Sequence, residues 1–315
     1  METSKQYSIP ILFVIFNRPE TALISFQEIK KVKPSRLYIA SDAPRDNVQN
    51  EKILVEKTRS LILSEIDWEC EVKTLFHEKN LGCGIGVYSA INWIFENEEH
   101  GIILEDDCVV NATFFKYMEE LLNRYALDER IGMIAGTNPL IQFHSSSSYI
   151  FSKYKSCWGW ATWKRAWRNM DLSMNWRNKD SDSVLMNAGY CGMDYDGWKY
   201  KIKCIDNNVV SAWDWQWYFS LSAQNQLCIY PSSNLVSNIG TDANATHTSG
   251  SNITLESFSM EFPIKHPNYI MPNFEFDRLF YLESNTLLIK FKRLLPLFLK
   301  NKLKNIVVKI RKYYA

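Results

Sequence analysis

The sequence predicts an α/β protein whose first half forms a mostly parallel sheet with helices on both faces. Strand-like and helix-like segments alternate four times, with short connections, between about residues 9 and 105, which is typical of βαβ units. The chain has 315 residues, 46% of them hydrophobic and 23% charged. This is ordinary globular composition, with enough length for one large domain or two smaller ones.

Each of these elements follows from its own residues. Residues 9–16 are a short apolar run, the pattern of a parallel strand that is buried on both faces. Pro19 follows that run and suits the first turn of a helix, because its missing N–H has no partner to lose there. The same patterns give further strands at about 36–40, 71–77 and 101–105, and helices at about 19–31, 48–64 and 85–97.

The rest of the chain gives weaker signals. A helix is expected over about 111–126 and a strand over 131–135, and nine of the eleven tryptophans lie within residues 158–217. We expect residues 136–283 to form a second, Trp-rich half that is built around the first half, residues 1–135, within one domain.

The C-terminal segment differs from the rest in charge. Residues 284–315 contain nine Lys and Arg and no Asp or Glu, whereas residues 1–283 contain 27 basic and 35 acidic side chains. The segment has the pattern of an amphipathic helix interrupted at Pro296. Its charge predicts binding to an anionic membrane surface, although a helix packed on the acidic body would have the same composition. An acidic body does not predict nucleic-acid binding.

Absent motifs limit the function further. The seven cysteines form no C-x-x-C pair, so their spacing predicts neither a zinc finger nor a disulfide framework. Residues 1–8 do not resemble a signal peptide, no uncharged apolar run is long enough to span a bilayer, and a reducing cytoplasm is the expected compartment. The sequence contains no P-loop, no nucleophile elbow and no dinucleotide-binding glycine pattern after its first strand.

Polar side chains follow three of the predicted strands at their carboxyl ends. They are Asn17-Arg18, Ser41-Asp42 and Glu105-Asp106-Asp107. In a parallel sheet these ends lie at one edge, where ligands bind. Carboxylates are hard oxygen ligands for Mn²⁺ or Mg²⁺, so the triplet predicts a divalent cation that bridges a diphosphate. A solvated turn or a helix cap at the triplet, and an Asx turn at Asp42, are the alternatives.

The strand that ends in Leu104-Glu105-Asp106-Asp107-Cys108, followed by Phe114-Phe115, resembles the acidic motif of GT-A glycosyltransferases. It is similar to the N-acetylglucosaminyltransferase I group and to bacterial family 2-like glycosyltransferases, which are nucleotide-diphospho-sugar transferases. The resemblance covers about residues 9–250 and implies a Rossmann-like GT-A fold. Its further pieces are Phe16-Asn17-Arg18-Pro19, Asn80-Leu81-Gly82, Asn238-Ile239-Gly240 and Ala245-Thr246-His247-Thr248.

The resemblance implies roles at the metal. Asp107, the last acid of the triplet, would ligate Mn²⁺ or Mg²⁺, and Glu105 and Asp106 would contact ribose or sugar hydroxyls. His247 lies in a segment, residues 230–250, whose Ser, Asn, Thr and Gly content predicts a loop. A neutral imidazole there would complete the metal shell or contact the diphosphate; an ordinary surface histidine is the alternative.

Residues for the nucleotide-sugar are implied in the same way. Asp42 would hydrogen-bond the uracil or ribose. Asn17 and Arg18 belong to the first nucleotide loop, with Arg18 near the base or the diphosphate. Trp158-Gly159 would contribute backbone near the donor sugar. Sugars also stack on aromatic rings, but the tryptophans around this position are equally expected in a core cluster.

Asp214 lies between Trp213 and Trp215. A carboxylate among tryptophans is expected to be partly desolvated, a setting that suits a general base. The N-acetylglucosaminyltransferase I group has an acidic residue in a comparable Trp-rich segment as its base. The resemblance therefore implies that Asp214 deprotonates the acceptor hydroxyl in an inverting displacement. A structural, hydrogen-bonded aspartate is the alternative.

The residues and the resemblance together predict a metal-dependent glycosyltransferase, and the resemblance to the bacterial group implies a role in bacterial surface polysaccharide synthesis. It would move a sugar from a nucleotide-sugar, a UDP-sugar, to a glycan acceptor at the inner face of the plasma membrane, and a lipid-linked acceptor would explain the basic segment. The alternative is a non-catalytic membrane-surface adaptor with the same fold that binds a glycan or a partner protein. The three polar strand ends favour the enzyme. A nucleotidylyltransferase would need a basic first loop, and only Arg18 is present there.

Overall fold

The computed structural model of the chain describes residues 6–211, 213–240 and 255–285. Eight strands form one sheet: β1 (Ile11–Ile15), β2 (Arg36–Ser41), β3 (Glu71–Phe76), β4 (His100–Glu105), β6 (Ile131–Ala135), β7 (Tyr149–Ser152), β8 (Trp160–Trp163) and β9 (Leu227–Pro231). Their order is β3-β2-β1-β4-β8-β6-β9-β7. β1 to β4 are mutually parallel, β8 runs antiparallel between β4 and β6, and β7 is an antiparallel edge strand beside β9. The predicted α/β class is confirmed.

The first half follows the predicted alternation closely. Its helices are α1 (Pro19–Val32), α2 (Glu51–Ser64) and α3 (Gly82–Asn97), each between two strands. Pro19 occupies the first turn of α1, where proline fits. α2 begins a few residues later and α3 a few residues earlier than predicted. Both start at loops that belong to the candidate site described below.

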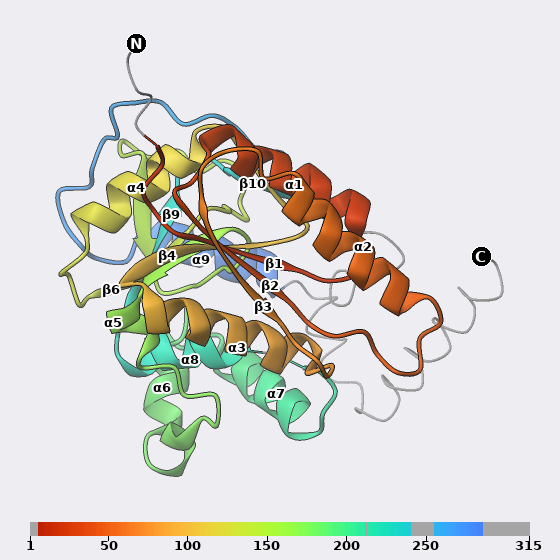
Figure 1. Cartoon of the computed structure of the whole chain (residues 1–315). Coiled ribbons are helices and arrows are strands. Elements are labelled where there is room, and N and C mark those ends of the chain that lie inside the picture. The colour runs from red at the N-terminus through yellow and green to blue at the C-terminus, as the bar shows by residue number, and fades with distance from the viewer. Residues whose placement is uncertain (1–5, 212, 241–254, 286–315) are drawn as a thin grey trace, which may run out of the picture.

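Helices cover both faces of the sheet (Figure 1). Successive residues of β1 point to opposite faces: Phe13 packs in one core with side chains of α1, α2 and α4 (Phe114–Arg124), whereas Leu12 packs in another core with side chains of α3. Both residues are fully buried. Burial on both faces explains why the strand is apolar along its length.

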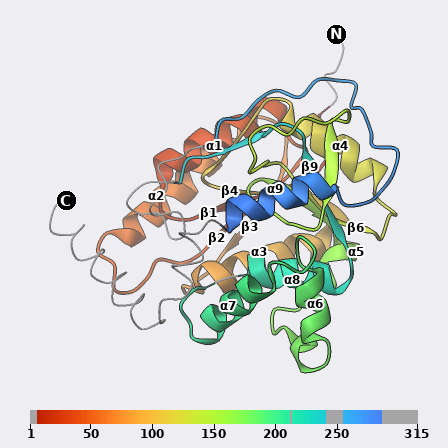
Figure 2. The same cartoon turned by 180° about the vertical axis from the view of Figure 1, so that it is seen from behind.

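The second half extends the same sheet and adds helices to it. These are α5 (Lys164–Trp167), α6 (Ser181–Asn187), α7 (Tyr195–Asp206), α8 (Asp214–Ala223) and α9 (Phe274–Ser284), with a short 3₁₀ helix at Asn175–Asn178. Figure 2 shows α9 lying across the strands, with α6, α7 and α8 gathered below it. The expected second half therefore shares its sheet with the first, since β8 pairs directly with β4.

Part of the predicted loop at 230–250 is a strand. β9 extends to Pro231, and β10 (Val236–Asn238) pairs antiparallel with β5 (Cys108–Val110). Two such short strands have too few residues to show a period in sequence. Residues 241–254, including His247, lie outside the described residues.

Most of the basic segment predicted over 284–315 also lies outside the described residues, which end at Asn285. Among the helices that are described, none combines the length and the apolar character needed to cross a bilayer.

Candidate functional site

Three of the predicted polar strand ends meet at one edge of the sheet. Ile15, the last residue of β1, is level with Ser41 of β2, and Val14 is level with Glu105 of β4. The residues that follow these strands therefore leave the sheet side by side, as expected for the carboxyl ends of parallel strands.

Arg18 joins the first strand end to the acidic triplet. Its guanidinium forms ion pairs with the carboxylates of Asp106 and Asp107, and its Nη2 lies 3.0 Å from Asp107 Oδ2. Asp106 is 3% exposed and also accepts a hydrogen bond from the Phe16 backbone N–H at 3.3 Å. Asp106 therefore holds Arg18 and the first loop together. Its predicted contact with a hydroxyl of the ligand stays a prediction.

Negative charge is in excess at this edge. Burial, followed by the charges of Asp107, Asp106 and Asp214, raises the pKa of Glu105 to about 8. Burial likewise raises the pKa of Asp106 to about 6, against the lowering effect of Arg18. One guanidinium thus faces several carboxylates that resist ionising together, a setting typical of functional sites.

Residues 238–240 lie directly against Asp107. The Asn238 side-chain N–H donates to Asp107 Oδ1 at 3.2 Å, and the Ile239 backbone N–H donates to the Asp107 carbonyl at 2.9 Å. A Cβ at Gly240 would lie 2.1 Å from Asp107 Oδ2 and 3.0 Å from Arg18 Nη1. Only glycine allows the backbone to approach the carboxylate this closely.

Trp158-Gly159 reaches the same region from the start of β8. Gly159 has a φ of +57°, and a Cβ there would lie 2.9 Å from Val236 of β10. Its carbonyl accepts a hydrogen bond from the Gly136 backbone N–H at 2.7 Å. Trp158 is partly buried against the core that contains Phe13. The backbone contact of this segment with the donor sugar stays a prediction.

Asp214, the first residue of α8, is half-buried. Its charge raises the pKa of Glu105, and together with burial and the three acids of the triplet it raises the pKa of Cys83 to about 12. Residues more than 100 positions apart in sequence are thus brought close enough to interact. The predicted base therefore lies within electrostatic reach of Glu105, the first acid of the triplet.

The carboxylate of Asp42 is occupied by backbone donors. It accepts hydrogen bonds from the N–H groups of Ala43 at 2.9 Å, Leu81 at 2.9 Å and Gly82 at 2.8 Å. These contacts fix the loop after β2 to the start of α3, where Gly82 has a φ of +76°. None of these contacts is an Asx turn, because the residue two positions after Asp42 is Pro44, which has no backbone N–H. The nucleotide contact of Asp42 stays a prediction.

Sequence reasoning missed a buried carboxylate beside Asn17. The Asn17 side chain donates to Glu51 Oε1 at 2.8 Å, and Glu51, 1% exposed, also pairs with the Arg45 guanidinium. Arg45 lies over the Phe16 ring, 5.8 Å from its centroid. An acid at the start of a helix gave no sign of burial in the sequence.

Most tryptophans of the second half belong to a core rather than to a ligand pocket. The four that stack together are Trp160, Trp167, Trp213 and Trp217, each at most 4% exposed. The core alternative is correct for these four, and they fix the start of α8 and hence Asp214 against β8.

A divalent cation fits the chemistry of this edge, although no preformed cage holds one. Within the described ranges, no three His, Cys, Asp or Glu side chains are grouped so that they could bind a metal ion by themselves. Mg²⁺ is commonly held by one or two carboxylates together with substrate phosphates and water. Asp107 could supply such a ligand, and the excess negative charge favours a cation. The predicted contribution of His247 lies outside the described residues.

Comparisons with known proteins give only distant likenesses. No protein-family model matches the chain, and no curated protein matches its sequence. Among solved structures, UDP-glucose pyrophosphorylase complexed with UDP-glucose is 9% identical, with a TM-score of 0.38 over 73% of this chain and 92% of that one. The inositol-1-phosphate CTP transferase from T. maritima is 10% identical, with a TM-score of 0.32 over 54% and 77%. These values are too low to bear on activity.

Proposed function

We propose that this chain is a GT-A-type, metal-dependent glycosyltransferase that moves a sugar from a nucleotide-sugar, a UDP-sugar, to a glycan acceptor. The proposal rests on one observation: Arg18, the acidic triplet, Gly240 and Asp214 converge at the carboxyl edge of a parallel sheet. An Arg beside carboxylates that can hold a cation suits a ligand that carries a diphosphate.

In the proposed step, the acceptor hydroxyl oxygen forms a bond to the anomeric carbon of the donor sugar, and Asp214 takes the hydroxyl proton. The bond from that carbon to the diphosphate oxygen breaks, and its electron pair leaves with UDP. Arg18, oriented by Asp106 and Asp107, stabilises the charge that develops on the diphosphate. A divalent cation at Asp107 would supply further stabilisation of the same charge. A single displacement of this kind inverts the anomeric centre.

Calorimetric titration of the full chain with UDP, with and without Mn²⁺, tests the donor site. We expect binding that depends on the metal. Titration with uridine is the matched control, because uridine lacks the diphosphate and should bind weakly in both conditions. The absence of UDP binding with and without metal would contradict the proposal and favour the adaptor.

We also propose that the enzyme works at the inner face of a bacterial plasma membrane on a lipid-linked glycan of surface polysaccharide synthesis. The composition of residues 284–315 supports this, because basic amphipathic segments bind anionic lipid. Co-sedimentation of the full chain with anionic and neutral vesicles tests it. We expect binding to anionic vesicles that weakens with added salt. Equal binding to both kinds of vesicle would contradict the proposal.

A further inference from the structure

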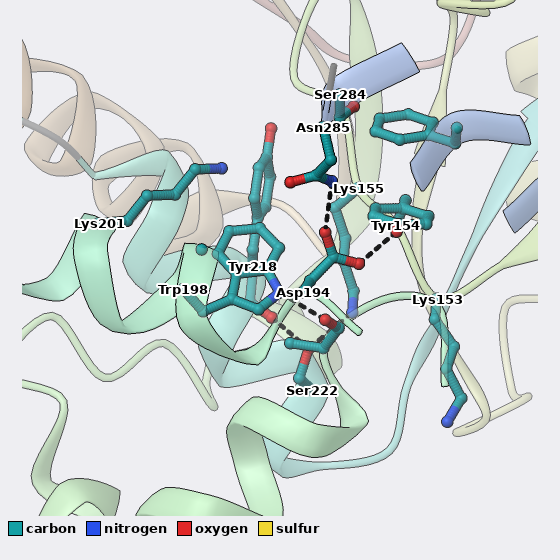
Figure 3. A pocket seen from close by; sticks show the side chains of 13 residues that line it. Lys153, Tyr154, Lys155, Asp194, Trp198, Lys201, Tyr218, Ser222, Ser284 and Asn285 are labelled. Atoms are coloured by element: carbon teal, nitrogen blue, oxygen red, sulfur yellow. Dashed lines mark hydrogen bonds between the residues drawn. The ribbon is translucent and has the colours of Figure 1, made fainter. Parts of the chain in front are cut away.

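A second cavity lies on the side of α8 that carries Tyr218 and Ser222 (Figure 3). Its volume is about 240 Å³, and it is bounded by α7, α8, α9 and the segment between β7 and β8. Neither the acidic triplet nor Arg18 lines it. The polar residues of its lining include Tyr154, Lys155, Asp194, Tyr218, Ser222 and Asn285.

Lys155 is the central charged group of this cavity. Its residue is 7% exposed, and its ammonium donates to Ser222 Oγ at 2.7 Å. The single proton of that hydroxyl is directed to the Tyr218 carbonyl at 2.8 Å, so Ser222 can only accept from Lys155. Within the described part of the chain, no carboxylate lies within ion-pair distance of Lys155. A buried ammonium with two unused N–H donors is costly unless an anion reaches it.

The carboxylate that lines the same cavity does not serve as that anion. Asp194 accepts hydrogen bonds from the Tyr154 hydroxyl, from the Asn285 side chain at 3.0 Å and from the Tyr190 backbone N–H at 3.3 Å. Figure 3 shows it held between Tyr154 and Asn285. These donors fix its position, and because the carboxylate lines the cavity, it can accept a further hydrogen bond from a hydroxyl group of a ligand.

The walls suit a small hydroxylated ligand. Trp198, Tyr218 and Phe280 contribute aromatic surface, on which the C–H faces of a sugar can pack. The volume lies below the roughly 300–1,000 Å³ of pockets for drug-sized ligands, which limits the occupant to about one sugar ring.

Tyr218 connects this cavity to the candidate site. Its ring forms a wall, and its hydroxyl donates to Cys157 Sγ at 3.5 Å. The charge of Asp214 acts on both Tyr218 and Cys157. A ligand in the cavity would therefore lie on the Asp214 side of the catalytic centre, which is the side proposed for the acceptor.

We infer that this cavity binds the phosphate or carboxylate group of a sugar-sized acceptor, with Lys155 as the cation that recognises it and Asp194 as an acceptor for its hydroxyl groups. The acceptor role rests on the proposed glycosyl transfer. The anion site itself rests only on the cavity and on Lys155.

The experiment measures binding of glucose 6-phosphate, glucuronate and glucose to the full chain by calorimetry, with UDP and Mn²⁺ present to occupy the donor site. We expect at least one anionic sugar to bind at least tenfold more tightly than glucose. The preferred sugar shows whether the group recognised is a phosphate or a carboxylate. Lys155→Met should weaken that binding at least tenfold, whereas Lys52→Met, on the exposed face of α2, should leave it unchanged.

Ser222→Ala is a second test that does not depend on the folding of Lys155→Met. It removes the oxygen that orients Lys155 and keeps both charges, so we expect anionic sugar binding to weaken by a smaller factor. Equal affinity of wild type, Lys155→Met and Ser222→Ala for the anionic sugars, or no preference over glucose, would overturn the inference. Anionic sugar binding without UDP binding would leave the anion site standing and contradict the donor site instead.

Discussion

The sheet-edge site and the second cavity, which is lined by Lys155, carry opposite charge. At the sheet edge, the carboxylates of Glu105, Asp106 and Asp107 face one guanidinium, and burial raises the pKa of Glu105 to about 8. In the second cavity, Lys155 has no carboxylate partner among the described residues, and burial lowers its pKa to about 7. One site is short of a cation and the other is short of an anion.

This difference indicates what each site is built to receive. A surplus of buried charge of one sign raises the free energy of the empty protein, and a ligand of the other sign removes that cost. The edge would take a metal cation together with a diphosphate, which Arg18 and the cation can share. The second cavity would take an anion. A donor and an acceptor can then be distinguished by charge alone.

Of the variants considered, Asp214→Asn should have the largest effect on activity, because Asp214 is the proposed base between the donor site and the second cavity. The amide cannot accept the acceptor proton, so we expect kcat for UDP release from the UDP-sugar that binds best to fall by about 10²–10⁴-fold. Affinity for UDP, measured by calorimetry, should stay the same. Asp196→Asn, at an exposed acid in the first turn of α7, is the control and should retain activity. Weaker UDP binding in Asp214→Asn would indicate a structural role instead.

Asp107→Asn tests whether the negative charge at the sheet edge binds a metal ion. Loss of this carboxylate removes the proposed metal ligand and one partner of Arg18, so we expect kcat/KM to fall by about 10²–10³-fold and UDP binding to lose its dependence on Mn²⁺. Asp67→Asn, an exposed acid that pairs with Lys30, should behave as wild type. If UDP binding by Asp107→Asn still depends on Mn²⁺, then residues other than Asp107 bind the metal.

Gly240→Ala tests the close approach of backbone to Asp107. The new methyl group would lie 2.1 Å from Asp107 Oδ2, so the loop or the carboxylate must shift. A displacement of this size at a positioning group can cost up to about a hundredfold, and we expect at least a tenfold loss of UDP affinity. At Gly86 in α3 the added Cβ would lie 3.4 Å from Asp42 Oδ2, an ordinary contact, so Gly86→Ala is the control. Unchanged affinity in Gly240→Ala would exclude residues 238–240 from the donor site.

The sheet edge could be predicted from sequence because its geometry follows from local patterns. Each β–α alternation fixes where a strand ends, and parallel strands put those ends together, so the neighbours of Asp107 at this edge followed from spacing. The placement of Gly240 beside Asp107 could not be predicted from local patterns, since 133 positions separate the two residues. The burial of Glu51 could not be predicted, because it depends on how the loop before α2 folds back onto Asn17.

The second cavity could not be predicted, for a different physical reason. Its lining comes from four segments that no periodicity connects, and Lys155 lies in a short stretch between two strands. Hydrophobic patterns report which face of an element is buried, but they do not report which polar group of one element meets that of another. The tryptophans show the same limit: their number indicated a special region, and the contacts decided that Trp160 and Trp217 belong to the core.

Lys155→Met gives the smallest expected effect and tests the charge of the second cavity without any ligand. The folded pKa of Lys155 is about 7, against 10.5 as the ordinary value, so between these pH values the unfolded chain binds more protons. The free energy of unfolding of the wild type therefore rises with pH in that window. Methionine does not titrate, and Lys155→Met should be the more stable protein at about pH 7, with an advantage that shrinks toward about pH 10. Groups that act on Lys155 or share its cavity are Asp277, Lys153, Cys228, Asp194, Lys201 and Tyr218.

Urea unfolding of both proteins at about pH 7 and at about pH 9.5 measures this difference. The Lys52→Met variant should show no such pH-dependent gap from wild type, because the Lys52 side chain is largely exposed. If the Lys155→Met protein is instead the less stable one at about pH 7, then the ammonium is already stabilised in the empty cavity. In that case the contrast between a site short of a cation and a site short of an anion would not hold, because the protein itself would supply the counter-charge.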